Sequence, residues 1–87
     1  MYYVYFLSLD QKVIYKGLTT DLKRRIGEHK RGKVKSTSRY EKIQLVGYEA
    51  YLLKSDAFRR ERFLKTSEGR RLFKQQYRDF LKQLNVV

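Results

Sequence analysis

The strongest structural signal in this sequence is a stripe of apolar residues near its C-terminal end. With spacings of four, three and four, and two leucines that widen it, the stripe comprises Phe73, Tyr77, Phe80, Leu84, Leu72 and Leu81. This spacing predicts one amphipathic helix over residues 70–84. A surface for a partner would also explain the stripe, but packing against a sheet needs fewer assumptions. The rest of the chain is therefore expected to supply a sheet.

Strand-type sequence lies at the N-terminus and in the middle of the chain. Residues 2–7 and 13–18 are rich in aromatic and β-branched side chains, and residues 8–12 separate them. This arrangement predicts a β-hairpin. Residues 43–52 have the character of a third strand.

Capping residues delimit two further helices. The first is expected over residues 21–31, with N-cap chemistry in its initial aspartate and with Gly32 placed to end it. The second is expected over residues 57–66 after a Ser55-Asp56 cap, and Gly69 separates it from the third. These elements predict an α+β fold, a small three-stranded, mainly antiparallel sheet flanked by about three helices. A single domain over residues 1–87 is expected.

The charge of the chain narrows its partners. Lys and Arg number 21 against 9 acidic residues, a net charge of +12. Because an excess of one sign repels itself, solubility alone explains it less well than a polyanionic partner such as a nucleic acid. The apolar opening, residues 1–9, is too short to span a bilayer and has no basic leader. We therefore expect a cytoplasmic protein without a membrane partner.

The residue inventory also limits the possible metal sites. The chain has no cysteine and only one histidine, which excludes a disulfide framework, thiolate sites and a His-rich zinc site. A metal would depend on carboxylate, water and substrate oxygens. Such ligands favour a hard divalent ion, Mg²⁺ or Mn²⁺.

Two polar residues border the apolar face of the first expected helix. At about 100° per residue, His29 falls between Leu22 and Ile26, and Arg25 lies about 60° to one side. An arginine that extends to solvent and a hydrogen-bonded core histidine would explain both structurally. A functional role is the other interpretation.

The second expected helix carries a carboxylate within its apolar stripe. Ala57, Glu61 and Leu64 lie within about 60° of one another. Such a glutamate requires a partner, and an ion pair with Lys65, four residues on, is the main local explanation. The other is a metal ligand at the floor of a cleft.

Tyrosines are dense in the two hairpin strands, which read Tyr3-Val4-Tyr5 and Tyr15-Lys16-Gly17. If the strands pair, two phenols can face one cleft, although the sequence does not fix the register. Cross-strand aromatic pairing is the structural alternative. Gly17 would allow a sharp turn or the close approach of a phosphate.

These two triplets resemble the motifs of the GIY-YIG endonuclease family, in particular its small stand-alone members and the catalytic domain of the excision-repair nuclease UvrC. Tyr3-Val4-Tyr5 stands in place of Gly-Ile-Tyr, and Tyr15-Lys16-Gly17 in place of Tyr-Ile-Gly, within a resemblance that covers most of residues 1–69. Leu18 stands where the excision-repair enzymes often have a lysine. If that lysine assists deprotonation, this chain uses another group or does without.

Further matches follow in the family's order. The segment after Gly17 resembles the one that leads to the family's catalytic arginine, here Arg25. His29 fits a position occupied by His or Tyr, and Glu61 fits the metal-binding glutamate.

The resemblance implies a metal-dependent endonuclease that hydrolyses phosphodiester bonds in DNA, with a role in repair or recombination. Glu61 would hold one Mg²⁺ or Mn²⁺, Arg25 would hold the phosphate, Tyr5 or Tyr15 would orient or deprotonate the attacking water, and His29 would assist. The expected substrate contacts are Lys16, Gly17, Lys33, Lys35 and Arg39. For the last three, a solvated mobile loop is the alternative. For the whole chain, the alternative is a catalytically inactive nucleic-acid-binding module with the same fold.

Overall fold

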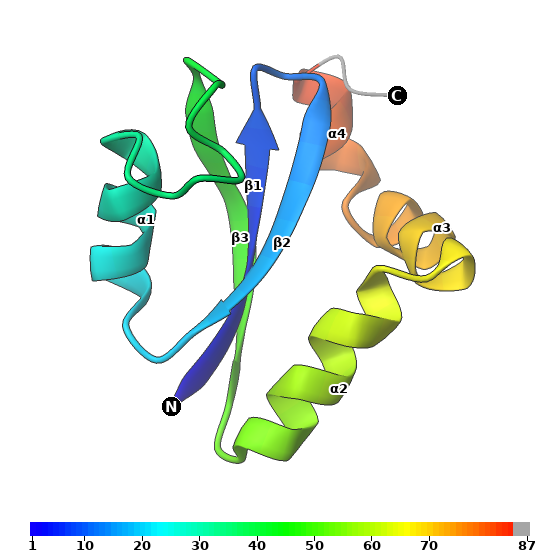
Figure 1. Cartoon of the computed structure of the whole chain (residues 1–87). Coiled ribbons are helices and arrows are strands. Elements are labelled where there is room, and N and C mark those ends of the chain that lie inside the picture. The colour runs from blue at the N-terminus through cyan, green and yellow to red at the C-terminus, as the bar shows by residue number, and fades with distance from the viewer. Residues whose placement is uncertain (85–87) are drawn as a thin grey trace.

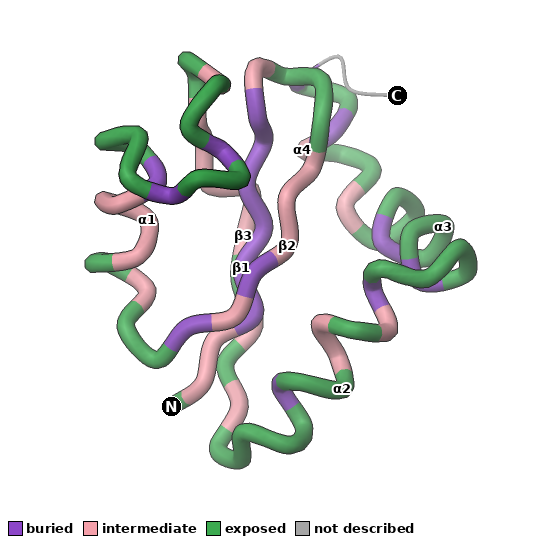
Figure 2. The backbone as a smooth tube through the Cα atoms, viewed as in Figure 1, coloured by how far each residue is buried: buried purple, intermediate pink, exposed green. Residues whose placement is uncertain are grey.

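The expected hairpin forms two strands of a three-stranded antiparallel sheet, and the α+β fold is confirmed (Figure 1). The computed structural model describes residues 1–84, so the last part of the expected 1–87 domain lies outside the described residues. The strands are β1 (Tyr2–Leu9), β2 (Val13–Thr19) and β3 (Ile43–Tyr51), in the order β2-β1-β3. The central position of β1 explains why its residues from Val4 to Leu9 are all buried (Figure 2).

Four helices cover the two faces of this sheet. They are α1 (Leu22–Lys30), α2 (Lys54–Leu64), α3 (Ser67–Gln76) and α4 (Arg78–Gln83). In Figure 1, α1 lies on one side of the sheet and the other three helices on the opposite side. None of them, within residues 1–84, combines the length and apolar character needed to cross a membrane.

Strand alternation divides the core into two halves. Tyr5, Leu7 and Leu9 pack on the α1 face, whereas Val4 and Phe6 pack on the face covered by α2, α3 and α4. Successive side chains of a strand point to opposite faces, so one strand supplies both halves.

The single C-terminal helix expected from the apolar stripe is instead two helices with a break at Tyr77. The Tyr77 ring packs on Phe6, at 5.4 Å between centroids, and stacks on Phe73 at 4.6 Å. The change of direction after this anchored ring lets α4 bury Leu81. Leu72, expected in the stripe, is 37% exposed.

Two expected helix boundaries also differ. The second helix begins at Lys54 with Leu53 at the N-cap, so Asp56 is not the cap but lies in the first turn, where it pairs with Arg59. Gly69 does not separate two helices but lies inside α3, which Thr66 caps. A Cβ at Gly69 would lie 1.9 Å from the Phe63 carbonyl oxygen, so the glycine permits the close approach of α2 and α3.

Candidate active site

The register of the hairpin places the two motif tyrosines on the α1 face. Tyr5 pairs with Gly17 and Leu7 pairs with Tyr15, and the two phenol rings lie 6.2 Å apart. Gly17 continues the strand, so the sharp turn considered from the sequence is wrong. A Cβ there would lie 2.4 Å from the Tyr5 hydroxyl, and the glycine therefore makes room for that phenol.

Helix α1 brings the chain's histidine to the same place. Asp21 caps the helix by accepting a hydrogen bond from the Arg24 amide at 3.1 Å, and Gly32, at φ +72°, follows its end, both as expected. His29 is completely buried, and its Nε2 lies 2.8 Å from the Tyr5 hydroxyl. The Tyr15 ring lies 5.1 Å from the imidazole.

The loop after α1 supplies a partner that the sequence did not reveal. Thr37 is buried, and its hydroxyl oxygen lies 2.8 Å from His29 Nδ1. That hydroxyl can donate to the Val34 carbonyl at 3.4 Å, and we therefore assign its oxygen as the acceptor from Nδ1–H. Nε2 is then the acceptor, and the Tyr5 hydroxyl donates to it.

Burial and a neighbouring guanidinium set the protonation of this chain of hydrogen bonds. Burial raises the pKa of Tyr5 to about 12, although Arg25 beside the phenol acts in the opposite direction. Burial, and then Arg25, lower the pKa of His29. At neutral pH the phenol is therefore protonated and the imidazole neutral, as the hydrogen bonds require. Lys16 does not assist the phenol, because its amine lies over Phe73 on the other face.

The depressed pKa of His29 predicts a pH dependence of stability. Histidine in the unfolded chain has a pKa of about 6.5, so the unfolded chain binds more protons than the folded one as the pH falls through that value. The free energy of unfolding should be largest above this pH and decrease below it, before the carboxylates titrate. Urea unfolding between neutral pH and about pH 5 should show this decrease in the wild type and not in His29→Gln. The same slope in both proteins would contradict the neutral, buried imidazole.

Arg25 lies at the border between this cluster and solvent. Its side chain is 36% exposed, and its guanidinium pairs with Glu28 at 3.0 Å. Glu28 also binds Arg24 at 2.7 Å, so one carboxylate is shared by two arginines. Arg25 also lines a surface hollow with Leu18 and Lys54. It can therefore reach both the Tyr5 phenol and a bound anion.

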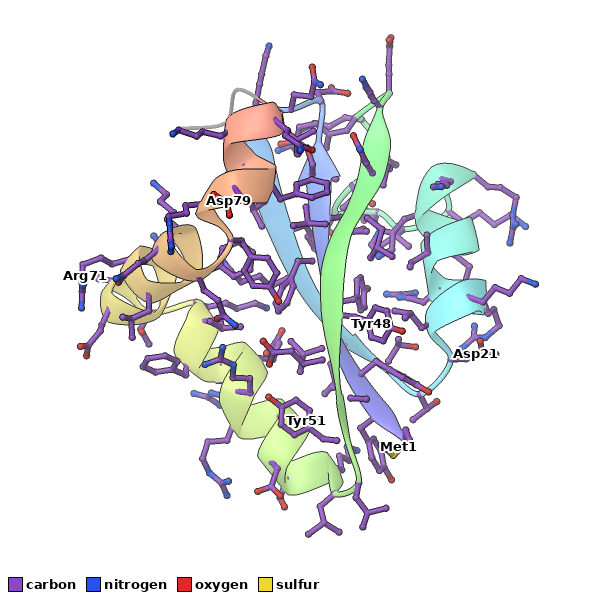
Figure 3. All side chains as sticks on the ribbon, turned by 180° about the vertical axis from the view of Figure 1, so that it is seen from behind. Met1, Asp21, Tyr48, Tyr51, Arg71 and Asp79 are labelled. Atoms are coloured by element: carbon purple, nitrogen blue, oxygen red, sulfur yellow. The ribbon has the colours of Figure 1, made fainter. Side chains whose placement is uncertain are left out.

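Glu61 lies on α2, on the opposite side of the sheet from His29. A pair between Arg60 and Glu49 at 3.0 Å ties this helix to β3, where Tyr51 also lies (Figure 3). Glu61 sits among buried neighbours as expected, with a side chain 13% exposed, and its carboxylate binds Lys65 at 2.6 Å. The structure thus brings four predicted residues together on the α1 face, and one of them, Tyr15, lines a hollow with Lys65, the partner of Glu61.

The environment of Glu61 fits only a metal ion that takes few of its ligands from the protein. Within residues 1–84, no group of three or more His, Cys, Asp or Glu side chains is arranged to hold an ion. Mg²⁺ keeps several waters and is commonly held by one or two carboxylates together with substrate phosphates. A half-buried carboxylate at the surface fits that role, in competition with Lys65.

The predicted substrate contacts of the loop after α1 are exposed cations on an anchored segment. Lys33, Lys35 and Arg39 are exposed, whereas Val34 and Thr37 between them are buried, and Figure 2 shows these buried stretches. The loop is therefore held against the core, and its cations keep a fixed side toward solvent.

Comparisons with known proteins extend these observations. The model of the GIY-YIG catalytic domain matches residues 1–77. A UPF0213 protein of Haloquadratum walsbyi is 36% identical over 66 residues, covering 75% of this chain and 74% of that protein. One of Natronomonas pharaonis is 38% identical over 66 residues (75% and 78%), and one of Streptococcus pyogenes serotype M5 is 36% identical over 69 residues (78% and 75%). Among solved structures, none matches significantly.

Proposed function

Because the chain belongs to the GIY-YIG family, we propose that it is a metal-dependent endonuclease that hydrolyses phosphodiester bonds in DNA. The family is one of nucleases, so its substrates are nucleic acids; the relatives' names state no reaction. DNA as the substrate and a role in repair or recombination belong to the proposal.

The observation that best supports this function is the buried hydrogen bond between Tyr5 and His29, at 2.8 Å, beside Arg25. A phenol with a pKa near 12 does not ionise alone at neutral pH. Because it donates to a neutral imidazole, it can accept a proton from water while its own proton passes to Nε2. Thr37 holds the tautomer that makes this transfer possible. Tyr15 is the other candidate for orienting the water.

The remaining residues meet the electrostatic demands of the reaction. Negative charge builds on the phosphoryl oxygens as water attacks, and the planar guanidinium of Arg25 can bind two of them without losing its proton. Glu61 would hold one divalent ion, Mg²⁺ or Mn²⁺, which would supply several kcal/mol of stabilisation to the charge that develops in the transition state. The exposed cations Lys33, Lys35 and Arg39 contact the phosphates of the DNA backbone.

One observation favours the alternative of an inactive nucleic-acid-binding module. The Glu61 carboxylate already has a partner in Lys65 at 2.6 Å, which is a complete structural explanation of that residue. In such a module the basic surface would bind DNA, and replacing Glu61 would leave the affinity for DNA unchanged.

Arg25→Ala tests the proposed role of the phosphate-binding arginine. Loss of a group that stabilises developing charge should slow DNA cleavage by about 100- to 1000-fold, because no other guanidinium lies beside Tyr5 among the described residues. Arg59→Ala is the control, since Arg59 is also paired with a carboxylate, that of Asp56, but is 74% exposed and lies outside the hollow that Arg25 lines. Cleavage rates with saturating enzyme measure both variants. Equal rates for the two would remove Arg25 from the site.

A further inference from the structure

A second basic surface lies on the face of β2 that is turned away from His29. There a groove runs between β2 and α3, with cations on its walls and apolar residues at its floor. Its main residues are Lys12, Lys16, Arg70 and Lys74 on the walls, and Ile14 and Phe73 at the floor. Strand alternation explains the separation, because Lys16 and Tyr15 are neighbours in one strand and point to opposite faces.

The four wall cations carry no compensating charge. Within the part of the chain that the structure describes, the arginines and lysines within 4.0 Å of a carboxylate are Arg24, Arg25, Arg59, Arg60, Lys65 and Arg71, and none of these is a wall cation. The Lys16 amine lies 5.1 Å from the centre of the Phe73 ring. Burial, and then the nearby cations led by Arg70, lower its pKa. Like charges gathered in one hollow repel one another, and a bound polyanion relieves that repulsion.

The groove continues to the proposed metal ligand. A second hollow shares Lys16 and Arg70 with the groove and adds Tyr15 and Lys65. Lys65 in turn binds Glu61 at 2.6 Å. The cations therefore form a continuous line along the edge strand that ends at the site.

The length of this line suits more than one phosphate. A strand advances about 3.3 Å per residue, so the part of β2 from Val13 to Lys16 is about 10 Å long, and Lys12 extends the line from the turn before it. Duplex DNA carries a phosphate about every 3.4 Å of axis on each strand. A single small anion would use only part of such a line.

We propose that the groove between β2 and α3 binds the DNA backbone beside the phosphate that is cut. This assignment rests on the proposed nuclease function. It gives the chain a second backbone contact, separated by the sheet from the cations of the loop after α1. The surface is concave and its aromatic floor is buried, which favours an extended polyanion over a lipid surface.

A double substitution tests the groove without touching the proposed catalytic residues. Arg70→Gln with Lys74→Gln removes two wall cations, and Arg71→Gln with Arg78→Gln removes the same charge from exposed positions outside the groove. Figure 3 shows Arg71 directed away from the sheet. The probe is a labelled duplex DNA, titrated in EDTA at several salt concentrations so that cleavage does not enter.

The groove variant should bind this DNA about tenfold more weakly at moderate salt, and its slope of log affinity against log salt should be smaller by about 2, since two phosphate contacts are lost. The control should keep the wild-type slope. Urea unfolding should show the groove variant to be about as stable as the wild type, because the repulsion that is removed offsets the loss of the hydrogen bond from Arg70 to the Lys65 carbonyl oxygen. Equal DNA affinity for the groove variant and the control would overturn the proposal. Binding to phosphatidylcholine vesicles that contain phosphatidylserine is measured in parallel. A groove variant that binds these vesicles more weakly but keeps its DNA affinity would also overturn the proposal.

Failure of the nuclease proposal remains distinguishable. Wild-type cleavage is assayed separately with Mg²⁺ and Mn²⁺. Weaker DNA binding by the groove variant, but not by the control, supports a DNA-backbone site even if the wild type cuts no DNA. The absence of wild-type cleavage would overturn only the proposed endonuclease activity.

Discussion

Glu61→Gln should reduce metal-dependent DNA cleavage by at least about a thousandfold while leaving DNA binding largely intact. The substitution keeps the size of the side chain and removes the charge that would hold a divalent ion. Its effect on stability should be small, because Lys65, the partner that is left, is 55% exposed and its ion pair contributes about 0–1 kcal/mol. Single-turnover cleavage with Mg²⁺ and DNA binding in EDTA give the two readouts.

Glu68→Gln is the matched control for this variant. Glu68 is 68% exposed on the next helix and lies 3.8 Å from Arg71, so its loss removes the same charge from outside the site. If Glu61→Gln cleaved DNA as fast as Glu68→Gln, the ion pair with Lys65 would be the whole role of Glu61.

Gly69→Ala should destabilise the fold by about 3 kcal/mol or more. The added Cβ would lie 1.9 Å from the Phe63 carbonyl oxygen and 2.8 Å from the Leu64 Cα, and these are backbone atoms that cannot move aside cheaply. Phe63 and Leu64 are the last residues of α2. Moving α3 away from them would therefore also disturb α2, the helix that carries Glu61. Urea unfolding at neutral pH measures the loss.

The same substitution in α1 provides the control with the opposite sign. At Gly27 the nearest atom to an added Cβ is Arg31 Nη1 at 3.1 Å, the far end of a flexible side chain. Gly27→Ala should therefore stabilise the protein by about 0.5–1 kcal/mol, the usual gain of alanine over glycine within a helix. A Gly69→Ala protein that unfolds at the wild-type urea concentration would contradict the close packing of α2 and α3.

The features that the sequence predicted well are those with local causes. The positions of Arg25, His29 and Glu61 followed from helical periodicity, and the structure buries His29 and places Glu61 among apolar neighbours. The hairpin of the two tyrosine-rich strands followed from strand character, whereas the register that brings Tyr5 and Tyr15 to one face came only from the structure. In each case the signal is carried by residues close together in the chain.

The features that sequence reasoning missed depend on tertiary contacts. Thr37 lies in an irregular loop, where no periodicity marks it, and only the folded chain brings it to His29. The break at Tyr77 arises from packing of its ring on the sheet, and the helical position of Gly69 from the approach of a second helix. For Lys16 a signal existed, since strand alternation already directs it away from Tyr15.

The most direct test of the endonuclease is cleavage by the purified wild-type protein. Plasmid, single-stranded, nicked and branched DNA are incubated with Mg²⁺, with Mn²⁺ and with EDTA, beside Glu61→Gln prepared in the same way. We expect cleavage of at least one of these DNAs with a divalent ion, none in EDTA, and none above background with the variant. Binding of every DNA without cleavage of any, or equal cleavage by both proteins, would contradict this expectation.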